Sequence, residues 1–425
     1  MTSSTAGAGV PVDGTVAVVG ASLAGLRAAE ALRSEGFEGR LLLLGDEEHL
    51  PYDRPPLSKQ VLAGDWVPER AVLADRTKLN ELRIEHRPGH RAVGFDAPAR
   101  RVHLDDGSAL AADGVVLATG ARPRRLPGVP DRDGVGVLRT LEDSLALRHR
   151  VLDVGEGCRV VVVGAGFIGS EVASTCAGLG CAVTVLEALA TPLSTALGVR
   201  VGTACSAMHA RNGVDLRTGM GVVAVHEPGA GPPAGDGPAE GRAGRVELSD
   251  GTSIPADVVV VGVGVVPNVE WLADSGLEID NGVVCDAALF CADGVVAAGD
   301  LARFWFAPVG GLVRIEHWQV AAEQGVGAAR SLLAGRNGAE PFDTVPYFWS
   351  DQYGLRIQVL GHPGPDDDVE VVDGTLESER FVALYGRAGK LTAALAISRP
   401  RLLMAYRPLL AAGASFEEAL ALAPT

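Results

Sequence analysis

The sequence predicts an α/β fold that contains two tandem copies of one structural unit. Two glycine-rich turns each follow a run of β-branched residues and open an expected helix, over residues 15–32 and 160–179. The glycines that begin these turns, Gly20 and Gly164, lie 144 positions apart. The 425 residues include 47% hydrophobic residues and 55 glycines, which suits two or three domains rich in tight turns.

Both turns are typical of dinucleotide-binding units. The first glycine permits the tight bend, a small middle residue lets the backbone approach a pyrophosphate, and the last glycine lets helix and strand pack closely. The helix N-terminus then offers free N–H groups to the phosphates. The second turn has all three glycines, whereas the first has a serine in the middle. The predicted contacts are Gly20, Ser22, Leu23, Ala24 and Gly25 in the first turn, and Gly164, Gly166, Phe167, Ile168 and Gly169 in the second.

A second pair of segments repeats at the same spacing. Residues 104–123 are echoed by residues 248–267, again 144 positions later. Each block should form a hairpin, a buried strand and a turn that close the unit begun at the glycine-rich turn. Ordinary glycine and proline punctuation between strands is the alternative, but two tandem nucleotide-binding units are the simpler explanation.

Each unit also needs an acidic residue after its second strand, to accept hydrogen bonds from a ribose. The expected strands are residues 40–44, followed by Asp46 and Glu47, and residues 182–186, followed by Glu187. A carboxylate at Glu187 binds the ribose hydroxyls of NAD and repels the extra phosphate of NADP. The sequence therefore predicts NADH at the second unit.

Composition narrows the class of protein. The net charge of −16 disfavours a general nucleic-acid or membrane-surface binder. The six cysteines form no C-x-x-C pair, so we expect reduced packing residues. Residues 1–13 carry no secretory signal and are expected to be disordered, and the longest apolar run, 258–266, is too short to span a bilayer, which predicts a cytoplasmic protein. The Gly/Pro/Ala-rich segment 228–244 is interpreted as a flexible loop.

Residues 20–30, followed by 45–59, closely resemble the FAD-dependent NADH:ferredoxin reductases of bacterial oxygenase systems, the family that includes putidaredoxin and rubredoxin reductases and apoptosis-inducing factor. Motifs at 116–120, 296–300, 316–319 and 347–352 extend the resemblance over nearly the whole chain. It implies a glutathione-reductase-like flavoprotein with two Rossmann-type dinucleotide-binding domains and a C-terminal α+β domain. The implied divisions are an FAD domain at 10–120 and 247–331, an NAD domain at 121–246 and a C-terminal domain at 332–425. Within the last of these, strands are expected at 357–360 and 369–372, with a helical stretch at 401–410.

The resemblance also implies roles for single residues. Lys59 and Glu171 would pair beside the flavin and nicotinamide, and a separation beyond about 6 Å would contradict this. Trp318 would join them as a catalytic residue next to the flavin. Further cofactor contacts would be Arg54, Ala118, Thr119, Gly120, Gly264, Gly299, Asp300, Glu316, His317 and Trp349.

Each of these roles has a purely structural alternative. Glu171 suits the first turn of a helix because an acid there interacts favourably with the helix dipole. Asp300 could simply cap a helix, and Arg54 could belong to a solvated loop. The two tryptophans, Trp318 and Trp349, could be ordinary core aromatics.

The implied reaction is hydride transfer from NADH to FAD, then transfer of single electrons to an iron–sulfur ferredoxin that feeds an oxygenase. The ferredoxin would bind transiently, and the protein would be a monomer or weak dimer. The predicted basic patch for the ferredoxin consists of Arg122, Arg124, Arg125, Arg303 and Arg314.

Three other functions are known for proteins with this resemblance or fold. A flavin disulfide reductase needs a redox cysteine after the first unit's second strand, but residues 41–80 contain none. A signalling flavoprotein like apoptosis-inducing factor is disfavoured by the acidic charge. An NADH oxidase that donates electrons to oxygen remains open, because fold alone does not fix the electron acceptor.

Overall fold

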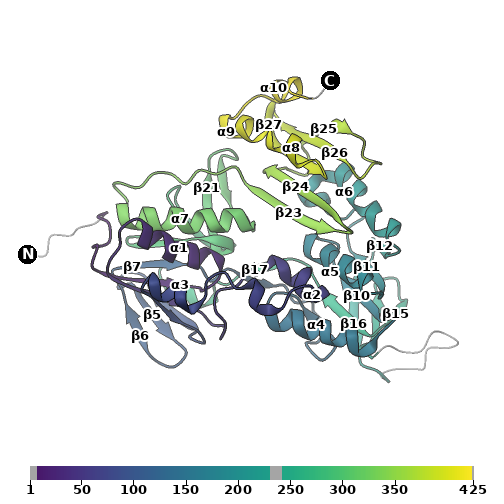
Figure 1. Ribbon diagram of the computed structural model, residues 1–425, viewed down its shortest axis with the longest axis horizontal. Helices are drawn as coiled ribbons and strands as arrows, with labels where there is room; N and C mark the ends of the chain where they lie inside the picture. Colours follow the sequence, from purple (N-terminus) through teal and green to yellow (C-terminus); the bar gives the residue numbers. More distant parts are fainter. Residues whose placement is uncertain (1–6, 230–241, 424–425) are drawn as a thin grey trace, which may run out of the picture. The chain divides into compact units, whose positions relative to one another are not determined.

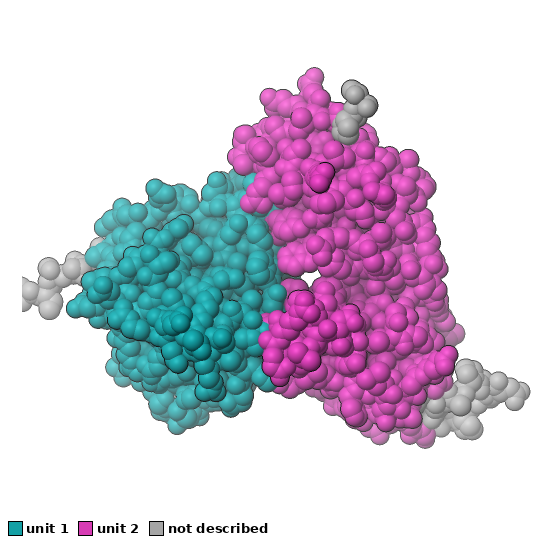
Figure 2. Space-filling view, viewed as in Figure 1, with its two compact units in different colours: residues 1–53, 72–122, 266–346 teal, residues 54–71, 123–265, 347–425 magenta. Residues whose placement is uncertain are grey.

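The computed structural model describes residues 7–229 and 242–423. The chain forms two compact units, each assembled from separated segments (Figure 2). Unit 1 comprises residues 1–53, 72–122 and 266–346, and unit 2 comprises residues 54–71, 123–265 and 347–425. The four-segment domain division expected from the sequence stays a prediction.

Unit 1 is built around a six-stranded sheet in the order β19-β20-β7-β1-β2-β3. All neighbouring pairs are parallel except β19–β20. The strands are β1 (Thr15–Val19), β2 (Arg40–Leu44), β3 (Ile84–Arg87), β7 (Gly114–Leu117), β19 (Phe290–Ala292) and β20 (Val295–Ala297). Helices α1 (Leu23–Ser34) and α7 (Trp318–Ala334) lie side by side in this unit (Figure 1). Their close approach depends on Gly325, where a Cβ would lie 2.3 Å from the carbonyl oxygen of Ala24.

Unit 2 contains a five-stranded parallel sheet in the order β12-β11-β10-β16-β9. Its strands are β9 (Val135–Val137), β10 (Arg159–Val163), β11 (Ala182–Glu187), β12 (Asp215–Thr218) and β16 (Val258–Val261). The helices next to this sheet include α4 (Leu141–Val154), α5 (Phe167–Gly178) and α6 (Ser194–Arg211). The valine-rich strands are buried, as expected for a parallel sheet covered by helices.

The two sheets repeat in detail, which confirms the predicted duplication. Asp113 accepts a hydrogen bond from the backbone N–H of Thr15, at the start of β1, with a length of 2.8 Å. Its counterpart 144 positions later, Asp257, accepts one from the backbone N–H of Arg159, at the start of β10, with a length of 3.0 Å. In each copy, therefore, an equivalent aspartate joins the first strand to the returning strand.

The predicted hairpins are also present. In unit 1, β5 (Arg101–Leu104) pairs antiparallel with β6 (Ala109–Ala111) and β4 (Ala92–Asp96). In unit 2, β14 (Gly244–Leu248) pairs antiparallel with β15 (Ser253–Ala256) and β13 (Val222–His226). A further small sheet in unit 1 contains β18 (Val283–Cys285), β21 (Ala302–Phe306) and β22 (Gly311–Val313).

The C-terminal residues of unit 2 form an antiparallel sheet in the order β23-β24-β27-β26-β25. Its strands are β23 (Tyr347–Gln352), β24 (Leu355–Gly361), β25 (Asp368–Gly374), β26 (Phe381–Arg387) and β27 (Lys390–Ile397). Helix α6 packs on this sheet through a stripe of buried residues at helical spacing, Leu197, Val201, Cys205 and Met208. Apolar packing therefore connects α6 with the C-terminal sheet.

The helical stretch expected at 401–410 is confirmed, and it consists of two short helices, α8 (Pro400–Met404) and α9 (Arg407–Ala412), followed by α10 (Phe416–Ala421). Two other sequence expectations are wrong. Asp300 caps no α-helix, because it lies in a 3₁₀ turn that leads directly into β21. Residues 7–13 take part in the fold, since the carbonyl oxygen of Val12 accepts hydrogen bonds from the N–H groups of Glu38 and Gly39.

Two further expectations concern the loop at 228–244 and membrane-spanning segments. Residues 230–241 of the segment interpreted as a flexible loop lie outside the described residues, so that interpretation stays a prediction. Among the described residues, no helix combines the length and the apolar character that crossing a bilayer requires.

Candidate functional site

The first glycine-rich turn, in unit 1, needs glycine for steric reasons. Gly20 has a φ of +118°, and a Cβ there would lie 2.1 Å from the carbonyl oxygen of Ala118. A Cβ on Gly25 would lie 1.8 Å from the carbonyl oxygen of Gly20. The two glycines thus allow β1, β7 and α1 to meet closely, as a dinucleotide-binding turn requires.

The N-terminus of α1 is suited to bind an anion. Ser22 occupies the N-cap position in extended conformation, and within the described residues its side chain makes no capping hydrogen bond. The first-turn N–H groups of Leu23, Ala24 and Gly25 therefore keep the character of an anion site.

The predicted second flavin motif lies against the same turn. Gly299 has a φ of +76°, and a Cβ there would come within 3.0 Å of the Ala24 side chain. Its N–H donates to Oε1 of Gln324 at 2.8 Å, while Nε2 of that buried amide has no hydrogen-bond partner among the described residues. Close backbone approach, an uncapped helix and an orphaned buried amide together fit a bound dinucleotide next to Asp300.

Other residues predicted to hold the first dinucleotide lie in loops at the carboxyl ends of the strands. Glu47 accepts a hydrogen bond from the hydroxyl of Tyr52, whereas Asp46 is exposed and 3.9 Å from Arg91. Thr119 donates to the carbonyl oxygen of Asn268 at 3.1 Å, and Gly120 follows it with a φ of +65°.

The second turn, in unit 2, repeats this geometry and adds an acidic residue. Gly164 has a φ of +101°, and a Cβ on Gly166 would meet nothing within 4 Å, which leaves space for a ligand. A Cβ on Gly169 would lie 2.0 Å from the carbonyl oxygen of Gly164. Glu187, at the end of β11, accepts hydrogen bonds of 2.9 Å from the N–H groups of Ala165 and Leu189. Its carboxylate is therefore fixed beside the turn.

The remaining residues predicted around the second turn are Phe167, Ile168 and Gly264, and their surroundings differ. Phe167 packs edge-on against Phe348 of β23, with ring centroids 4.8 Å apart. The side chain of Ile168 is 50% exposed. Gly264 lies after β16 with a φ of +93°, and its carbonyl oxygen accepts from the N–H of Arg124.

The predicted pairing of Lys59 and Glu171 is confirmed. Nζ of Lys59 lies 2.7 Å from Oε2 of Glu171, and only 12% and 3% of the two side chains are exposed. Lys59 separates the 3₁₀ helix η1 (Pro55–Ser58) from the short helix α2 (Gln60–Ala63), and Glu171 lies in the first half of α5. The place of this pair beside a flavin stays a prediction.

Neutral donors complete the environment of the Glu171 carboxylate. Ser58 donates to Oε2 at 2.6 Å, and Ser350 donates to Oε1 at 2.8 Å. The N–H of Asp351 also donates to Oε1, at 3.3 Å. Sequence reasoning missed Ser58 and Ser350, which are separated from Glu171 by 113 and 179 positions, although both lie inside motifs that carry the resemblance.

The other predicted catalytic and flavin residues lie in both units. In unit 1, Nε1 of Trp318 donates to Oδ1 of Asp53 at 2.6 Å. In unit 2, Arg54 donates to the carbonyl oxygen of Arg139 at 2.7 Å. Also in unit 2, Trp349 stacks on Tyr347 with ring centroids 6.1 Å apart.

The remaining flavin candidates lie on strand β23 and at the start of helix α7. Alternation along β23 places Trp349 on the opposite face from Ser350. In unit 1, His317 is the N-cap residue of α7. Glu316 precedes it and forms an ion pair with Arg314.

Four of the five arginines predicted to form a basic patch have carboxylate partners. In unit 1, Arg122 pairs with Glu270, Arg303 with Asp280 and Arg314 with Glu316, and in unit 2 Arg125 pairs with Asp131. Exposed Arg124 has no carboxylate within ion-pair distance in the described part of the chain. These ion pairs reduce the positive potential of the predicted patch, which stays a prediction.

The cysteines behave as the sequence suggests. All six are free, and four are buried. Burial raises the pKa of the Cys205 thiol to about 12. Hydrogen bonding with Cys181 and burial raise the pKa of Cys158, and hydrogen bonding with Cys291 and burial raise that of Cys285. Thiols with raised pKa values are poor nucleophiles, which argues against disulfide chemistry at these three positions.

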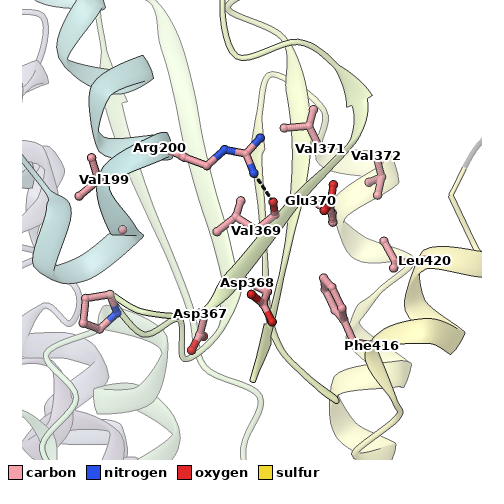
Figure 3. Close-up of a pocket in the computed structure, with 12 residues that line it drawn as sticks. Val199, Arg200, Asp367, Asp368, Val369, Glu370, Val371, Val372, Phe416 and Leu420 are labelled. Atoms are coloured by element: carbon pink, nitrogen blue, oxygen red, sulfur yellow. Dashed lines mark hydrogen bonds between the residues drawn. The ribbon is translucent and has the colours of Figure 1, made fainter. Parts of the chain in front are cut away.

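A pocket of about 770 Å³ lies elsewhere in unit 2, between α6, the edge strand β25 and α10 (Figure 3). Arg200 extends from α6 and donates to the carbonyl oxygen of Val369 on β25. Phe416 and Leu420 line it from α10. The described residues that line the pocket include none of those predicted from the sequence, so we assign it no part in the chemistry.

Comparison with known proteins agrees with this geometry. Residues 14–325 match the family described as pyridine nucleotide-disulphide oxidoreductase, and residues 347–425 match the family described as reductase C-terminal. The chain is 38% identical over 401 residues to rhodocoxin reductase of Rhodococcus erythropolis, which covers 93% of this chain and 89% of the relative. It is also 38% identical to the ferredoxin–NAD(+) reductase component of the anthranilate 1,2-dioxygenase system of Burkholderia cepacia, covering 93% and 94%.

A solved structure supports the same assignment. The reductase in the crystal structure of the covalent putidaredoxin reductase–putidaredoxin complex superposes with a TM-score of 0.86 and 32% identity. The match covers 94% of this chain and 93% of the other. The predicted resemblance and fold class are thereby confirmed. The chain belongs to the pyridine nucleotide-disulphide oxidoreductase family, in the group formed by the ferredoxin reductases of oxygenase systems.

Proposed function

We propose that this protein is an NADH-dependent ferredoxin reductase that uses FAD. The observation that carries the proposal is the duplicated dinucleotide-binding turn, in a chain that ferredoxin–NAD(+) reductase components match over nine tenths of its length. Two turns with the same steric requirements provide for two dinucleotides, one in each unit. Relatives that act with ferredoxins support a ferredoxin as the electron acceptor.

In this proposal the first turn binds FAD. Ser22 and the N-terminus of α1 would hold its pyrophosphate, and Asp300 would bind the ribitol or pyrophosphate region. Bound FAD supplies the chemistry, because it accepts a hydride from NADH and passes single electrons to a one-electron carrier. Arg54, Trp318, His317, Glu316 and Trp349 are kept as candidate flavin contacts.

The second turn binds NADH. The N-terminus of α5 faces the pyrophosphate, and Gly166 leaves room for it because it has no side chain. Glu187 accepts hydrogen bonds from the adenosine ribose, since the backbone already holds its carboxylate beside the turn. Lys59 and Glu171 act as a buried charged pair that orders the site of hydride transfer.

We further propose that the partner is an acidic iron–sulfur ferredoxin, bound transiently in the cytoplasm by a monomer or weak dimer. Arg124 is the residue that tests the charge complementarity, because no described carboxylate neutralises it. The variant Arg124→Glu should raise the KM for ferredoxin and leave NADH oxidation by ferricyanide unchanged. Arg101→Glu is the control, because Arg101 is an exposed residue of β5 outside the predicted patch. An equal fall of both activities in the Arg124 variant would contradict the role of this arginine.

Stopped-flow reduction of the FAD-loaded protein tests the whole proposal. The protein is mixed with NADH or NADPH, and the reduced protein is then mixed with a ferredoxin and cytochrome c. We expect rapid bleaching by NADH, slow bleaching by NADPH and ferredoxin-dependent reduction of cytochrome c. Reoxidation by oxygen alone would instead indicate an NADH oxidase. Slow bleaching that leaves a long-lived charge-transfer complex would favour a signalling flavoprotein.

A further inference from the structure

A second buried polar cluster in unit 2 has no role in the proposed chemistry. We call it the His209 network, and it consists of Ser170, His209 and Tyr353. Nδ1 of His209 lies 2.7 Å from the hydroxyl of Tyr353, and Nε2 lies 3.3 Å from Oγ of Ser170. The three residues come from α5, from the last turn of α6 and from the turn after β23. Ser170 and His209 are only 1% and 2% exposed.

The direction of these hydrogen bonds follows from a neutral His209 together with the acceptors that surround it. Burial lowers the pKa of His209 to about 4, so the imidazole is neutral at pH 7 and has one donor and one acceptor nitrogen. One arrangement gives every donor an acceptor. In it, the Tyr353 hydroxyl donates to Nδ1, Nε2–H donates to Ser170, and Ser170 donates to the carbonyl oxygen of Ala165 at 3.5 Å.

This chain of hydrogen bonds ends on the second glycine-rich turn. Ala165 lies between Gly164 and Gly166, and its N–H already donates to Glu187. Through this long hydrogen bond Ser170 contacts the carbonyl side of Ala165, whose amide side is bound by Glu187. Rotation of this backbone would redirect the N–H groups that the turn offers to a pyrophosphate.

Tyr353, in the turn after β23, holds the other end of this chain of hydrogen bonds. Tyr353 has a φ of +52°, and its backbone N–H donates to Oγ of Ser174 on α5 at 2.6 Å. Its ring meets the His209 imidazole edge-on, with centroids 5.5 Å apart. Apolar side chains could fill this volume without the desolvation cost of three polar groups, so filling space does not by itself explain their presence.

We propose that His209 and Tyr353 are positioning residues for NADH, which act through Ser170 to hold the second glycine-rich turn in its binding conformation. The inference rests on the proposed function in one respect, namely that NADH binds at this turn. It gives the C-terminal sheet a part in recognition of the nucleotide. Neither residue is required to touch the nucleotide.

The test compares two tyrosine-to-phenylalanine variants of the FAD-loaded protein. Tyr353→Phe removes the hydroxyl that orients His209. Tyr385→Phe is the matched control, because Tyr385 also belongs to the C-terminal sheet and donates a buried hydrogen bond to α6, at the carbonyl oxygen of Leu197, 3.0 Å away. The dissociation constant of NAD+ is measured by calorimetry, and KM for NADH and kcat are measured with ferricyanide. Thermal unfolding verifies that both variants fold.

Tyr353→Phe should raise the dissociation constant and KM on the order of fivefold, because one buried hydrogen bond is lost, and should leave kcat within about twofold. Tyr385→Phe should leave both constants within about twofold of the wild-type values. Ser170→Ala should give the same rise as Tyr353→Phe, and the double variant should add little to it, because both act through one chain of hydrogen bonds.

Two results would overturn the inference alone: wild-type affinity in Tyr353→Phe, or an equal loss in Tyr385→Phe. A wild-type protein that binds neither NAD+ nor NADH would overturn the proposed function as well.

Discussion

The Glu171 carboxylate shows how strongly a single residue depends on its partners. It is 3% exposed and accepts hydrogen bonds from Lys59, Ser58, Ser350 and the N–H of Asp351. A buried ion pair contributes little compared with an apolar pair of the same volume, but removal of one partner leaves an uncompensated buried charge. The cost of losing Lys59 should therefore be large.

We predict that Lys59→Met lowers the free energy of unfolding by about 3 kcal/mol, because Glu171 loses its cation. Ser350→Ala should cost about 2 kcal/mol, since it removes one neutral donor to a charged group. Lys78→Met is the control, because Lys78 pairs with Glu30 while 44% of its side chain is exposed. That change should cost less than about 1 kcal/mol. Urea unfolding measures all three, and equal losses at Lys59 and Lys78 would contradict the prediction.

We predict that Glu187 sets the preference for NADH over NADPH. Replacement by alanine should lower the preference for NADH over NADPH on the order of tenfold, because the negative charge no longer repels a 2′-phosphate. The ratio of kcat/KM values for the two nucleotides measures the effect. Asp46→Ala, which removes the acid beside the first turn, should leave that ratio unchanged. An unaltered ratio in the Glu187 variant would show that another group selects the nucleotide.

The sequence predicted residues whose chemistry is visible locally. Gly20, Gly164 and Glu187 follow a known spacing, and the Lys59–Glu171 pair came from a family motif. Ser350 and His209 were missed because their partners lie far away in the chain, and a lone serine or histidine carries no periodic signal. Such residues become apparent only when the fold has brought α5, α6 and β23 together.

At the scale of elements, burial decides how well the sequence predicts the structure. The parallel strands β1, β10 and β16 were predictable because they are continuous β-branched runs, covered on both faces. The sequence predicted the helical stretch at 401–410 but not its division into α8 and α9. Pro408 lies in the first turn of α9, where proline suits the start of a new helix better than the interior of a continuous one.

The strand-joining aspartates lead to a prediction for the elements themselves. Burial alone would raise the pKa of Asp257, but hydrogen bonds from the Arg159 side chain and from the N–H groups of Arg242 and Arg159 lower it to about 2. A depressed carboxyl pKa stabilises the folded state above the unfolded value of 3.8, and this contribution is lost as the pH falls from 3.8 toward 2. It amounts to about 2 kcal/mol.

We therefore expect Asp257→Asn to destabilise the protein by about 2 kcal/mol at pH 7, and the difference from wild type to shrink below pH 4. Urea unfolding between pH 7 and pH 3 measures this change. Asp113→Asn, at the matching position of unit 1, should cost less at pH 7, because Asp113 accepts from the backbone of Thr15 without an arginine partner among the described residues. A constant difference for Asp257→Asn across the range would contradict the role of its charge.

At the scale of the whole molecule, duplication explains how one chain can bind two nucleotides. Both copies keep the same type of turn, an equivalent returning strand and an equivalent aspartate, so the fold alone does not decide which nucleotide each copy takes. The difference lies in what surrounds each turn. Unit 1 brings Gly299 and Gln324 of the chain's later residues onto the first turn, whereas unit 2 places Glu187 and the His209 network on the second.

Hydrogen exchange can assign the two nucleotides to the two copies. In protein freed of FAD, addition of FAD should slow exchange of the amides at 22–26 and 299–301 in unit 1, because a ligand that binds only the folded form suppresses local opening. Addition of NAD+ should slow exchange at 165–170 in unit 2. AMP at the same concentration is the control, since it lacks the pyrophosphate and should protect each turn less. Protection of the first turn by NAD+ and of the second by FAD would reverse the assignment, and Glu187 and the His209 network would then act on the flavin nucleotide.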